Sequence, residues 1–597
     1  MVKTLGQYLF DSALPAGVKF SGPVDKKAVE KALGEFAKKD PYTYAQIVTE
    51  LKRLGDEVAT YEGISVGLDD IAPHYKTRDP ILKSALEQIK KTHSADERRK
   101  IILATQNKIR AAAGDHPGDM TLMAKSGGRG NFNQYMKTVA SPVGVTKSDG
   151  TTNPWLIARS YSEGLRPSEY WAAADEARQN AVEGKIQVTE PGVVGKKLIQ
   201  TMIDQVVTDV DCGTHNGIAI PAHDQKDMVD RFLAKPFAGF EYNTLITSQV
   251  AREIAKHPGV VIVRSPMTCA HNNTGVCAKC MGLSERGQQH SIGTNVGVRS
   301  AQGMSEPLTQ MTLSAKHSTR MAGDKTQLTG LQAVQAFINV PKVFPFSATL
   351  AQIAGKVTAV KTAPQGGHYV VIESTEHYVP PDLKVKVHPQ DTVEAGDALS
   401  TGVAKPDEVV RLKGMGHGRK YFVDSMHHAF KDAGVDIDKR HIELLARAQL
   451  NHVEIVDDPD EEFLPSDIVP FPRVRERLER DKERVPVAKA EGRVLAHDYL
   501  HYTAGTTVTP SLVKDLQTQF KEVEVSKSPL KFNFSMHPID QVPLLRGDWM
   551  ARLSHQHIKG SIIEGASEAQ ESDIHGLHPV PGYVYGLEFG HNDAGHY

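Results

Sequence analysis

The chain is poor in cysteine and tryptophan, and it has no long hydrophobic run. Only four of its 597 residues are cysteine and three are tryptophan. So few cysteines in a large chain exclude a secreted scaffold built on disulfides. No apolar run reaches the roughly 18 residues of a membrane span, and the N-terminal MVKTLGQYLFDSALPAG lacks the apolar core of a secretory signal. We therefore expect an intracellular, cytoplasmic protein.

Net charge is also small. The formal charge is −2 at pH 7, which argues against a free-standing basic nucleic-acid binder. An aromatic content of 6% gives no sign of a base-stacking surface. The length predicts several packed modules, and no internal repeat is evident.

Hydropathy patterning predicts a multidomain α+β protein with mainly helical modules. A Gly-rich break, SGGRGNFNQ, follows the first helical region, and Glu190-Pro191-Gly192 is expected to kink or break the second. The mixed-charge stretch RVRERLERDKERVPVAKAEGR is interpreted as a solvated helix face. The expected segments are helical 1–125, irregular 126–165, helical 166–207, strands and turns over 208–296, two helices around a polar loop over 297–345, a small β-barrel over 346–402 and helical 403–455. A C-terminal region over 456–597 follows and ends in loop-rich HGLHPVPGYVYGLEFG.

All four cysteines fall within one region. Cys277 and Cys280 form a C-x-x-C pair, Cys269 precedes them, and Cys212 is remote. Two thiolates on a tight turn, joined by two more, can complete the tetrahedral shell of a structural zinc ion. A thiol redox pair is the alternative, but it would leave Cys212 and Cys269 unexplained. We predict one structural zinc ion per chain.

Around the cysteines the sequence resembles a known family. The run from Arg264-Ser265 through Gly275-Val276-Cys277 to Glu306-Pro307-x-Thr309-Gln310-Met311-Thr312-Leu313 and His317 is similar to the β′ subunit of multisubunit RNA polymerase. TLGQYLFDSALP, ISVGLDDI, SGGRGNFNQ, VVTDVDCGT and the block from VVRLKGMGHG to LLARAQL match further β′ segments in the same order. The resemblance implies a structural zinc-binding domain, a bridge helix, a trigger-loop helical hairpin and a barrel-sandwich-like β module.

The resemblance assigns the bridge helix to 166–207, beside the template base. Arg178, Lys196 and Lys197 fall on basic family positions that could hold nucleic-acid phosphate. The family usually has Thr-Ala at the kink that faces the template. Here the pair is Val188-Thr189, followed by a glutamate and an added proline.

The resemblance also implies that residues 306–337 form the trigger loop and its flanking helices. Gln310 would contact the ribose and Leu313 would pack under the base, whereas Ser314 is short for the ribose contact made in relatives. His317 would approach the triphosphate as a proton donor or as a stabiliser of charge. Arg129, with Met123 nearby, would line the nucleotide entry side.

The magnesium-binding aspartates of the family are missing. Its Asn-Ala-Asp-Phe-Asp-Gly-Asp motif does not occur here, and the pairs Asp209/Asp211 and Asp436/Asp438 are interpreted as non-catalytic. Either the chain is a fragment or the gene is naturally split, and an initiating Met followed at once by matching sequence favours a natural split. The short spacing from His317 to Lys325 most resembles a giant-bacteriophage enzyme.

The expected function is therefore the C-terminal β′-type part of a DNA-templated RNA polymerase that is active only in a complex. Its expected partners are an N-terminal β′ chain that holds Mg²⁺, β-like subunits, DNA template, RNA transcript, nucleoside triphosphates and a candidate sigma-like factor, in the host cytoplasm, a phage compartment or the virion. The alternatives are a non-catalytic, zinc-bearing nucleic-acid-binding or regulatory protein and a thiol oxidoreductase.

Overall fold

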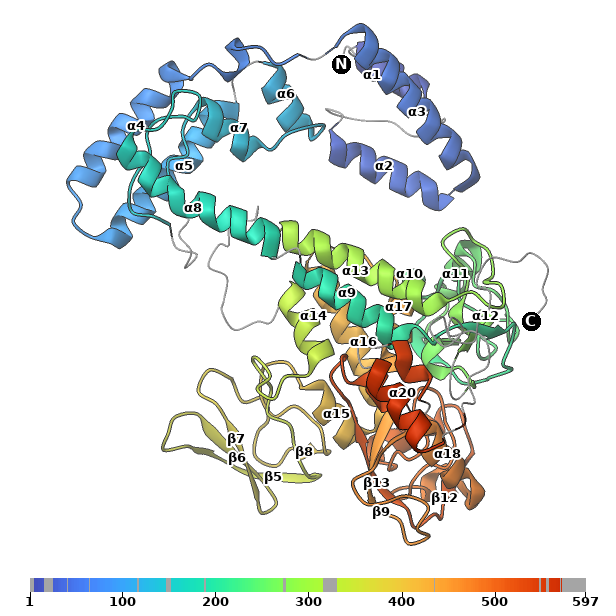
Figure 1. Cartoon of the computed structure of the whole chain (residues 1–597). Helices are drawn as coiled ribbons and strands as arrows, with labels where there is room; N and C mark the ends of the chain where they lie inside the picture. The colour runs from blue at the N-terminus through green and yellow to red at the C-terminus, as the bar shows by residue number, and fades with distance from the viewer. Residues whose placement is uncertain are drawn as a thin grey trace. The chain divides into compact units, whose positions relative to one another are not determined.

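The structure is a computed structural model, and it consists of two compact units, Met1–Lys185 and Ile186–Tyr597 (Figure 1). Each unit has its own hydrophobic core. The structure describes residues 5–14, 25–39, 41–63, 65–114, 118–145, 152–186, 189–271, 275–314, 330–433, 435–546, 549–554, 558–569 and 571.

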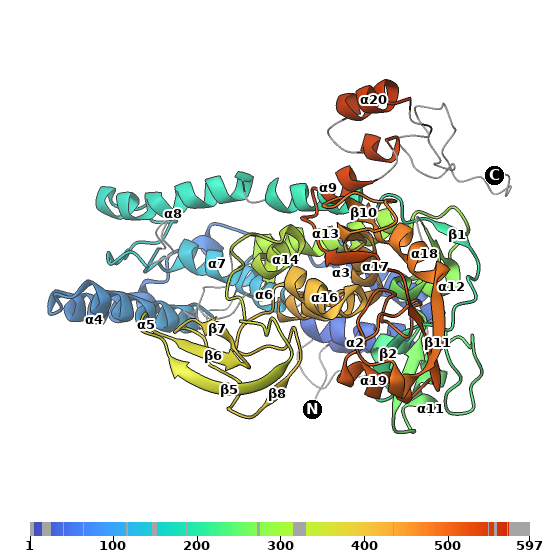
Figure 2. The same cartoon turned by 90° about the horizontal axis from the view of Figure 1, so that it is seen from below.

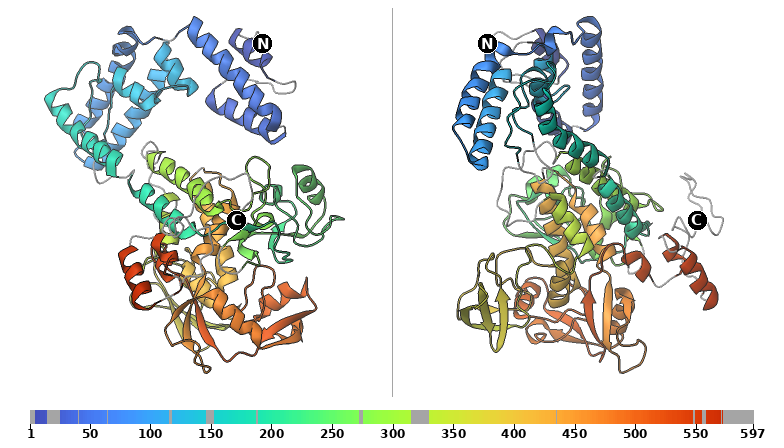
Figure 3. Two further views of the ribbon diagram at one scale, coloured as in Figure 1. Left: turned by 45° about the vertical axis from the view of Figure 1, so that its right-hand side comes forward. Right: turned by 60° about the vertical axis from the view of Figure 1, so that its left-hand side comes forward.

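The first unit is helical, as the sequence predicted. Its core forms where α4 and α5 pack side by side (Figure 3, blue) and α7 covers them, burying Ile102, Ile109 and Met136. The helices are α1 (Leu5–Ser12), α2 (Lys26–Lys39), α3 (Pro41–Tyr61), η1 (Asp69–Ile71), α4 (Tyr75–Lys90), α5 (Ala95–Gly114), α6 (Asp119–Ser126), α7 (Phe132–Val139) and α8 (Pro167–Ile186).

The start of α8 is fixed to this core by two acidic side chains. Glu169 accepts hydrogen bonds from the backbone N–H groups of Ala158 (2.9 Å) and Arg166 (2.9 Å). About two turns later, Glu176 accepts a hydrogen bond from Lys137 of α7 (2.8 Å). A carboxylate in the first turn is favourable because the helix N-terminus carries partial positive charge.

The second unit combines a helical core with several small sheets. Its helices are α9 (Thr189–Met202), α10 (Gln225–Met228), α11 (Ser248–Ile254), η2 (Pro266–Thr268), α12 (Ala278–Met281), α13 (Val296–Ser314), α14 (Gly330–Asn339), α15 (Pro406–Lys413), α16 (Met415–Asp432), α17 (Lys439–Gln449), α18 (Phe471–Arg480), η3 (Val487–Lys489), α19 (Pro510–Gln517), η4 (Val542–Leu545), η5 (Ala551–Ser554) and α20 (Ile558–Ser567). Its strands are β1 (Val207–Asp209), β2 (Ile218–Pro221), β3 (Val260–Val263), β4 (Val276–Cys277), β5 (Gly355–Thr362), β6 (His368–Ile372), β7 (Thr375–Val379), β8 (Thr392–Val393), β9 (His452–Asp457), β10 (Ile468–Pro470), β11 (Lys482–Pro486), β12 (Glu522–Ser526) and β13 (Lys531–Ser535).

Small residues bring α9 and α13 together at the centre of this unit. A Cβ added to Gly195 would lie 2.9 Å from the Cβ of Ser305, and one added to Gly297 would lie 1.8 Å from the carbonyl oxygen of Met202. The two helices can therefore approach this closely only because these positions lack a side chain. On another side, α13 packs against α17, which in turn packs against α16.

Within residues 346–402, where the sequence predicted a small β-barrel, the strands form a half-barrel sheet. The strands are antiparallel in the order β7-β6-β5-β8, and the sheet is visibly curved (Figure 2). Val357, Val370, Ile372 and Val379 fill its concave interior. A second antiparallel sheet has the order β10-β9-β13.

Two segments of the second unit follow the same backbone path. In each, an antiparallel strand pair (β2–β3 or β11–β12) frames a tight loop and a short helix (α11 or α19). We name residues 218–264 the first copy and residues 482–526 the second copy. The expectation that the chain has no internal repeat is therefore wrong.

The repeat extends to individual contacts at a constant spacing of 262 residues, as between Phe237 and Tyr499. Phe237 exchanges two backbone hydrogen bonds with Phe240, and Tyr499 does the same with Tyr502. The repeat escapes sequence inspection because few aligned residues are identical. From Arg231 onward these are Arg231/Arg493, Leu233/Leu495, Ala234/Ala496, Thr244/Thr506, Thr247/Thr509, Val261/Val523 and Val263/Val525.

The two copies also pack against each other. Ala234 and Ile262 of the first copy share a buried cluster with Leu495 and Val523 of the second. Next to it, the Lys235 ammonium lies 3.8 Å from the ring centroid of Phe520. The hydrophobic faces of the two copies therefore cover each other.

Two local predictions need correction. The second helical region is divided into two helices as predicted, since α8 ends at Ile186 and α9 begins at Thr189, but Glu190-Pro191-Gly192 is not the break itself. It lies in the first turn of α9, where proline costs no hydrogen bond. The mixed-charge stretch is helical only as far as Arg480; residues 482–486 then form β11, because they pair with β12 of the repeat. Among the described residues, no helix is both long and apolar enough to cross a membrane.

Candidate functional site

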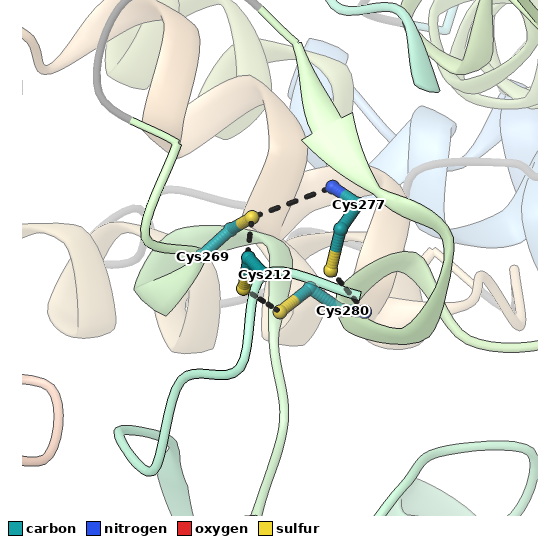
Figure 4. Close-up of side chains that lie close together, drawn as sticks. All are labelled: Cys212, Cys269, Cys277 and Cys280. Atoms are coloured by element: carbon teal, nitrogen blue, oxygen red, sulfur yellow. Dashed lines mark hydrogen bonds between the residues drawn. The ribbon is translucent and has the colours of Figure 1, made fainter. Parts of the chain in front are cut away.

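The structure brings the four cysteines into one cluster (Figure 4). Cys277 ends β4, Cys280 lies in α12, Cys269 follows η2 and Cys212 comes after β1. Their four sulfur atoms all lie within 4.8 Å of one another. Cys269, Cys277 and Cys280 are buried, whereas Cys212 is partly exposed. The predicted grouping of these cysteines is confirmed.

The cluster has the dimensions of a tetrahedral metal site. The Cys212 sulfur lies 3.7 Å from that of Cys280 and 3.7 Å from that of Cys269. Zinc–sulfur bonds of about 2.3 Å place neighbouring sulfurs about 3.8 Å apart in a tetrahedron. A disulfide would need them at about 2 Å. The four residues therefore fit one four-coordinate ion better than a redox pair.

Arg264 holds three of the sulfurs, and the sequence analysis did not foresee this role. Its Nη2 donates to the sulfurs of Cys212 (3.3 Å), Cys277 (3.3 Å) and Cys280 (3.4 Å). The side chain is fully buried. Burial opposes its charge, but Cys280, Asp211 and Cys277 together outweigh burial and raise the pKa of the guanidinium. A fixed cation beside the sulfurs favours their ionised, metal-binding form.

Asp211 anchors this arginine. It accepts hydrogen bonds from Arg264 Nη1 (2.6 Å), Lys279 Nζ (2.9 Å) and Asn243 Nδ2 (2.8 Å). Burial acts to raise the pKa of Asp211, but these donors and the Gly213 N–H hold it well below its usual range. Asp438 similarly caps α17 and pairs with Arg440. Both aspartates serve structural contacts, in agreement with their interpretation as non-catalytic.

Two charged side chains on α17, Glu443 and Arg447, form hydrogen bonds with the segments that carry the cysteines. Glu443 accepts two hydrogen bonds from Arg231 (2.6 and 2.8 Å) and one from Ser265 (2.6 Å), all buried. One turn on, Arg447 donates to backbone carbonyls of the loop that carries Cys269. A charged pair spaced by four on a helix is a weak signal in sequence, because it is typical of solvated faces.

Several residues that the resemblance assigns to the bridge helix and the trigger loop lie on α9 and α13. Thr189 begins α9 and is exposed, as is Lys196. Lys197 pairs with Asp540 at 3.3 Å, so a carboxylate competes with phosphate for its ammonium. Gln310, Leu313 and Ser314 fall in the last turns of α13, but their side chains lie outside the described residues, and so does His317.

A groove of about 770 Å³ runs between α9 and α13. Its walls are mixed. Lys196, Ile199 and Gln200 come from α9, and Ser305 and Glu306 from α13. The part of the predicted bridge segment that forms α9 therefore lies beside α13, whose last turns belong to the predicted trigger segment.

The remaining predicted residues lie in the first unit. Met123 is half-buried in α6, and Arg129 is exposed in the turn that follows it. The Arg129 N–H donates to the Met123 carbonyl (3.3 Å), which fixes the two residues relative to each other. Arg178 is exposed on α8.

Sequence comparison defines the class of this protein. Residues 164–467 match the family described as RNA polymerase Rpb1, domain 5. The chain belongs to this family, which contributes to the largest subunit of multisubunit RNA polymerases.

Individual relatives are all described as DNA-directed RNA polymerase subunit beta′. The chain is 28% identical to the protein of Acetivibrio thermocellus over 520 residues, covering 78% of this chain and 44% of the relative. It is 29% identical to the proteins of Kocuria rhizophila and Nocardia farcinica, covering 78% of this chain and 39% of each relative. The chain therefore spans less than half the length of these relatives.

Proposed function

We propose that this chain is the C-terminal β′-type part of a DNA-templated RNA polymerase, with 166–207 as bridge helix and 306–337 as trigger loop. The observation that carries the proposal is the packing of α9 along α13 at Gly195 and Ser305. An α13 that ends at Ser314 and an α14 that begins at Gly330 then bracket the segment that contains His317. A hinged hairpin beside a second helix is what closure over a nucleotide requires.

Within this proposal the exposed side chains have distinct roles. Lys196 and Arg178 hold nucleic-acid phosphate, whereas Lys197 exchanges Asp540 for phosphate on binding. Gln310, Leu313 and Ser314 contact the ribose and base of the incoming nucleotide. Arg129 and Met123 line its entry side.

Two metals have separate roles. The four cysteines hold one structural Zn²⁺, because their sulfurs have tetrahedral spacing and a buried cation beside them. Two-metal phosphoryl transfer needs clustered carboxylates, and the family's aspartate motif is absent from this sequence. Catalytic Mg²⁺ is therefore held by residues outside this sequence, and within the proposal a partner chain supplies them, as in a split β′ enzyme of the giant-bacteriophage kind.

The test is RNA synthesis by the reconstituted complex. The chain is co-purified with a partner that supplies the aspartate motif and with β-like subunits, and primer extension is followed on a DNA template. Extension should need every chain. His317→Ala should slow nucleotide addition about 100-fold, as loss of a proton donor does, whereas His388→Ala on the half-barrel should not.

Two results would separate this proposal from the alternative. Equal extension rates for His317→Ala and wild type would remove the role of His317. If the complete assembly binds template but makes no RNA, the chain is instead a non-catalytic, zinc-bearing nucleic-acid-binding protein.

A further inference from the structure

We propose that Cys269 is the ligand through which the metal enters and leaves the four-cysteine cluster, and that Arg447 of α17 sets how firmly this ligand is held. The inference rests on the zinc site proposed above. The four ligands are not held alike. Arg264 donates to three of the sulfurs, whereas the backbone of the fourth ligand, Cys269, is held by Arg447.

Three of the sulfurs are held directly. Cys212, Cys277 and Cys280 all accept hydrogen bonds from the same nitrogen of Arg264. Cys277 and Cys280 are also part of regular structure, since the Cys277 sulfur caps α12 by accepting from the Cys280 N–H (3.3 Å). These contacts tie the three ligands to one another and to regular structure.

Cys269 lacks this support. Among the contacts described, Arg264 does not donate to its sulfur, which accepts only from the backbone N–H of Cys277 at 3.4 Å. Cys269 lies after the end of η2, in extended conformation, at the start of the loop that leads to β4. The position of this sulfur therefore depends on the path of the loop.

Arg447 fixes that path from outside the cluster. Its Nη1 donates to the carbonyls of Pro266 (3.0 Å) and Cys269 (3.1 Å). Its Nη2 donates to the carbonyls of His271 and Gly275 (3.1 Å). One planar guanidinium thus spans the loop on both sides of Cys269, and it is only 7% exposed.

A lysine cannot make this set of contacts. Its ammonium is a single point with three donors, whereas the guanidinium is a rigid fork with five. Arg447→Lys keeps the charge but leaves some of the four carbonyls without a donor. The loop then loosens, and Cys269 is the ligand that leaves first.

The first experiment measures zinc release from the full-length protein under excess chelator. Wild type and Arg447→Lys should each hold one zinc ion as purified, but the variant should release it at least tenfold faster, the scale expected when an outer partner of a metal ligand is lost. Arg419→Lys is the matched control. Arg419 is as buried and also donates to a backbone carbonyl, that of Leu450, but it does not contact the cysteine region. Its variant should release zinc at the wild-type rate.

The second experiment identifies the labile ligand by Co²⁺ substitution. Cys269→Ser should still bind Co²⁺, with a charge-transfer spectrum of three thiolates, whereas Cys277→Ser should not bind it. Cys212 is the competing candidate because it is the most exposed ligand. The proposal is overturned if Arg447→Lys and Arg419→Lys release zinc equally, or if Cys212→Ser retains Co²⁺ and Cys269→Ser does not. Absence of zinc from the wild type would instead refute the zinc site itself.

Discussion

The two copies of the repeat share a backbone but are held together differently. The first copy (218–264) leads into the cysteine cluster and is buttressed by buried ionic contacts from α17. Neither copy contains a cysteine, and the strands of the second copy (482–526) carry ion pairs that reach solvent, such as Glu483 with Arg493 and Arg484 with Glu524. The same loop-and-helix path is therefore compatible with two kinds of ionic support: buried ion pairs beside the cysteine cluster, or ion pairs that reach solvent.

The largest predicted difference between the copies concerns the metal. Cys277→Ser should abolish zinc binding and unfold the region that follows the first copy, since structural zinc contributes about 10 kcal/mol or more to small domains. Limited proteolysis with mass spectrometry should then show new cleavage between residues 207 and 283 and little within the second copy. One zinc ion per chain in this variant would contradict the prediction.

A second comparison uses an aligned arginine. Arg231 is 2% exposed and pairs with Glu443, whereas its counterpart Arg493 is exposed. Arg231→Met should cost about 3–5 kcal/mol, because it leaves a buried carboxylate without its cation, whereas Arg493→Met should cost under about 1 kcal/mol. Urea denaturation of both variants measures the difference. Adding Glu443→Leu to Arg231→Met should recover part of the loss; no recovery would show that packing, not charge, is responsible.

A third comparison uses pH. Burial lowers the pKa of His501 in the second copy to about 3, with Lys420 and His417 acting in the same direction. Its unfolded pKa is about 6.5, so the unfolded chain binds the proton more readily. Stability from neutral His501 is therefore complete above pH 6.5 and is lost as pH falls toward 3, by about 1.4 kcal/mol per pH unit.

His501→Gln should remove this part of the acid sensitivity. The fall in melting temperature between pH 7.5 and 5 should be smaller for His501→Gln than for wild type. His388→Gln, at an exposed histidine, should behave as wild type. Identical pH profiles for all three proteins would exclude His501 as a source of acid sensitivity.

The smallest predicted difference lies at the helix caps. Thr247 accepts from the Val250 N–H and Thr509 from the Leu512 N–H, both at 3.3 Å. Thr247→Ala and Thr509→Ala should each cost about 1 kcal/mol, and the two costs should agree because the local geometry is the same. Unequal losses in the free energy of unfolding would show that the surroundings of the first copy change how much its helix cap contributes to stability.

Several features could be predicted from sequence because they are local. The cysteine spacing indicated a shared ligand shell, and the run EPLTQMTL lies in α13 as a helix. By contrast, the repeat was missed because its backbone path depends on hydrogen bonds and on the pattern of apolar residues. Phe237 and Tyr499 make the same backbone hydrogen bonds although they are different amino acids. The break expected at Pro191 moved because a proline is harmless in a first helical turn.

The amino-acid sequence by itself determined the ligand types, the helical periodicity and the family, since each is written in neighbouring residues. Only the tertiary structure decided which charges would be buried and what they would hold. Arg264 reaches three sulfurs, Glu443 reaches Arg231, and Arg447 reaches the loop of Cys269 across long sequence separations. Partners so distant are chosen by the packing of whole elements, because a buried charge must find its counterpart wherever the fold places one.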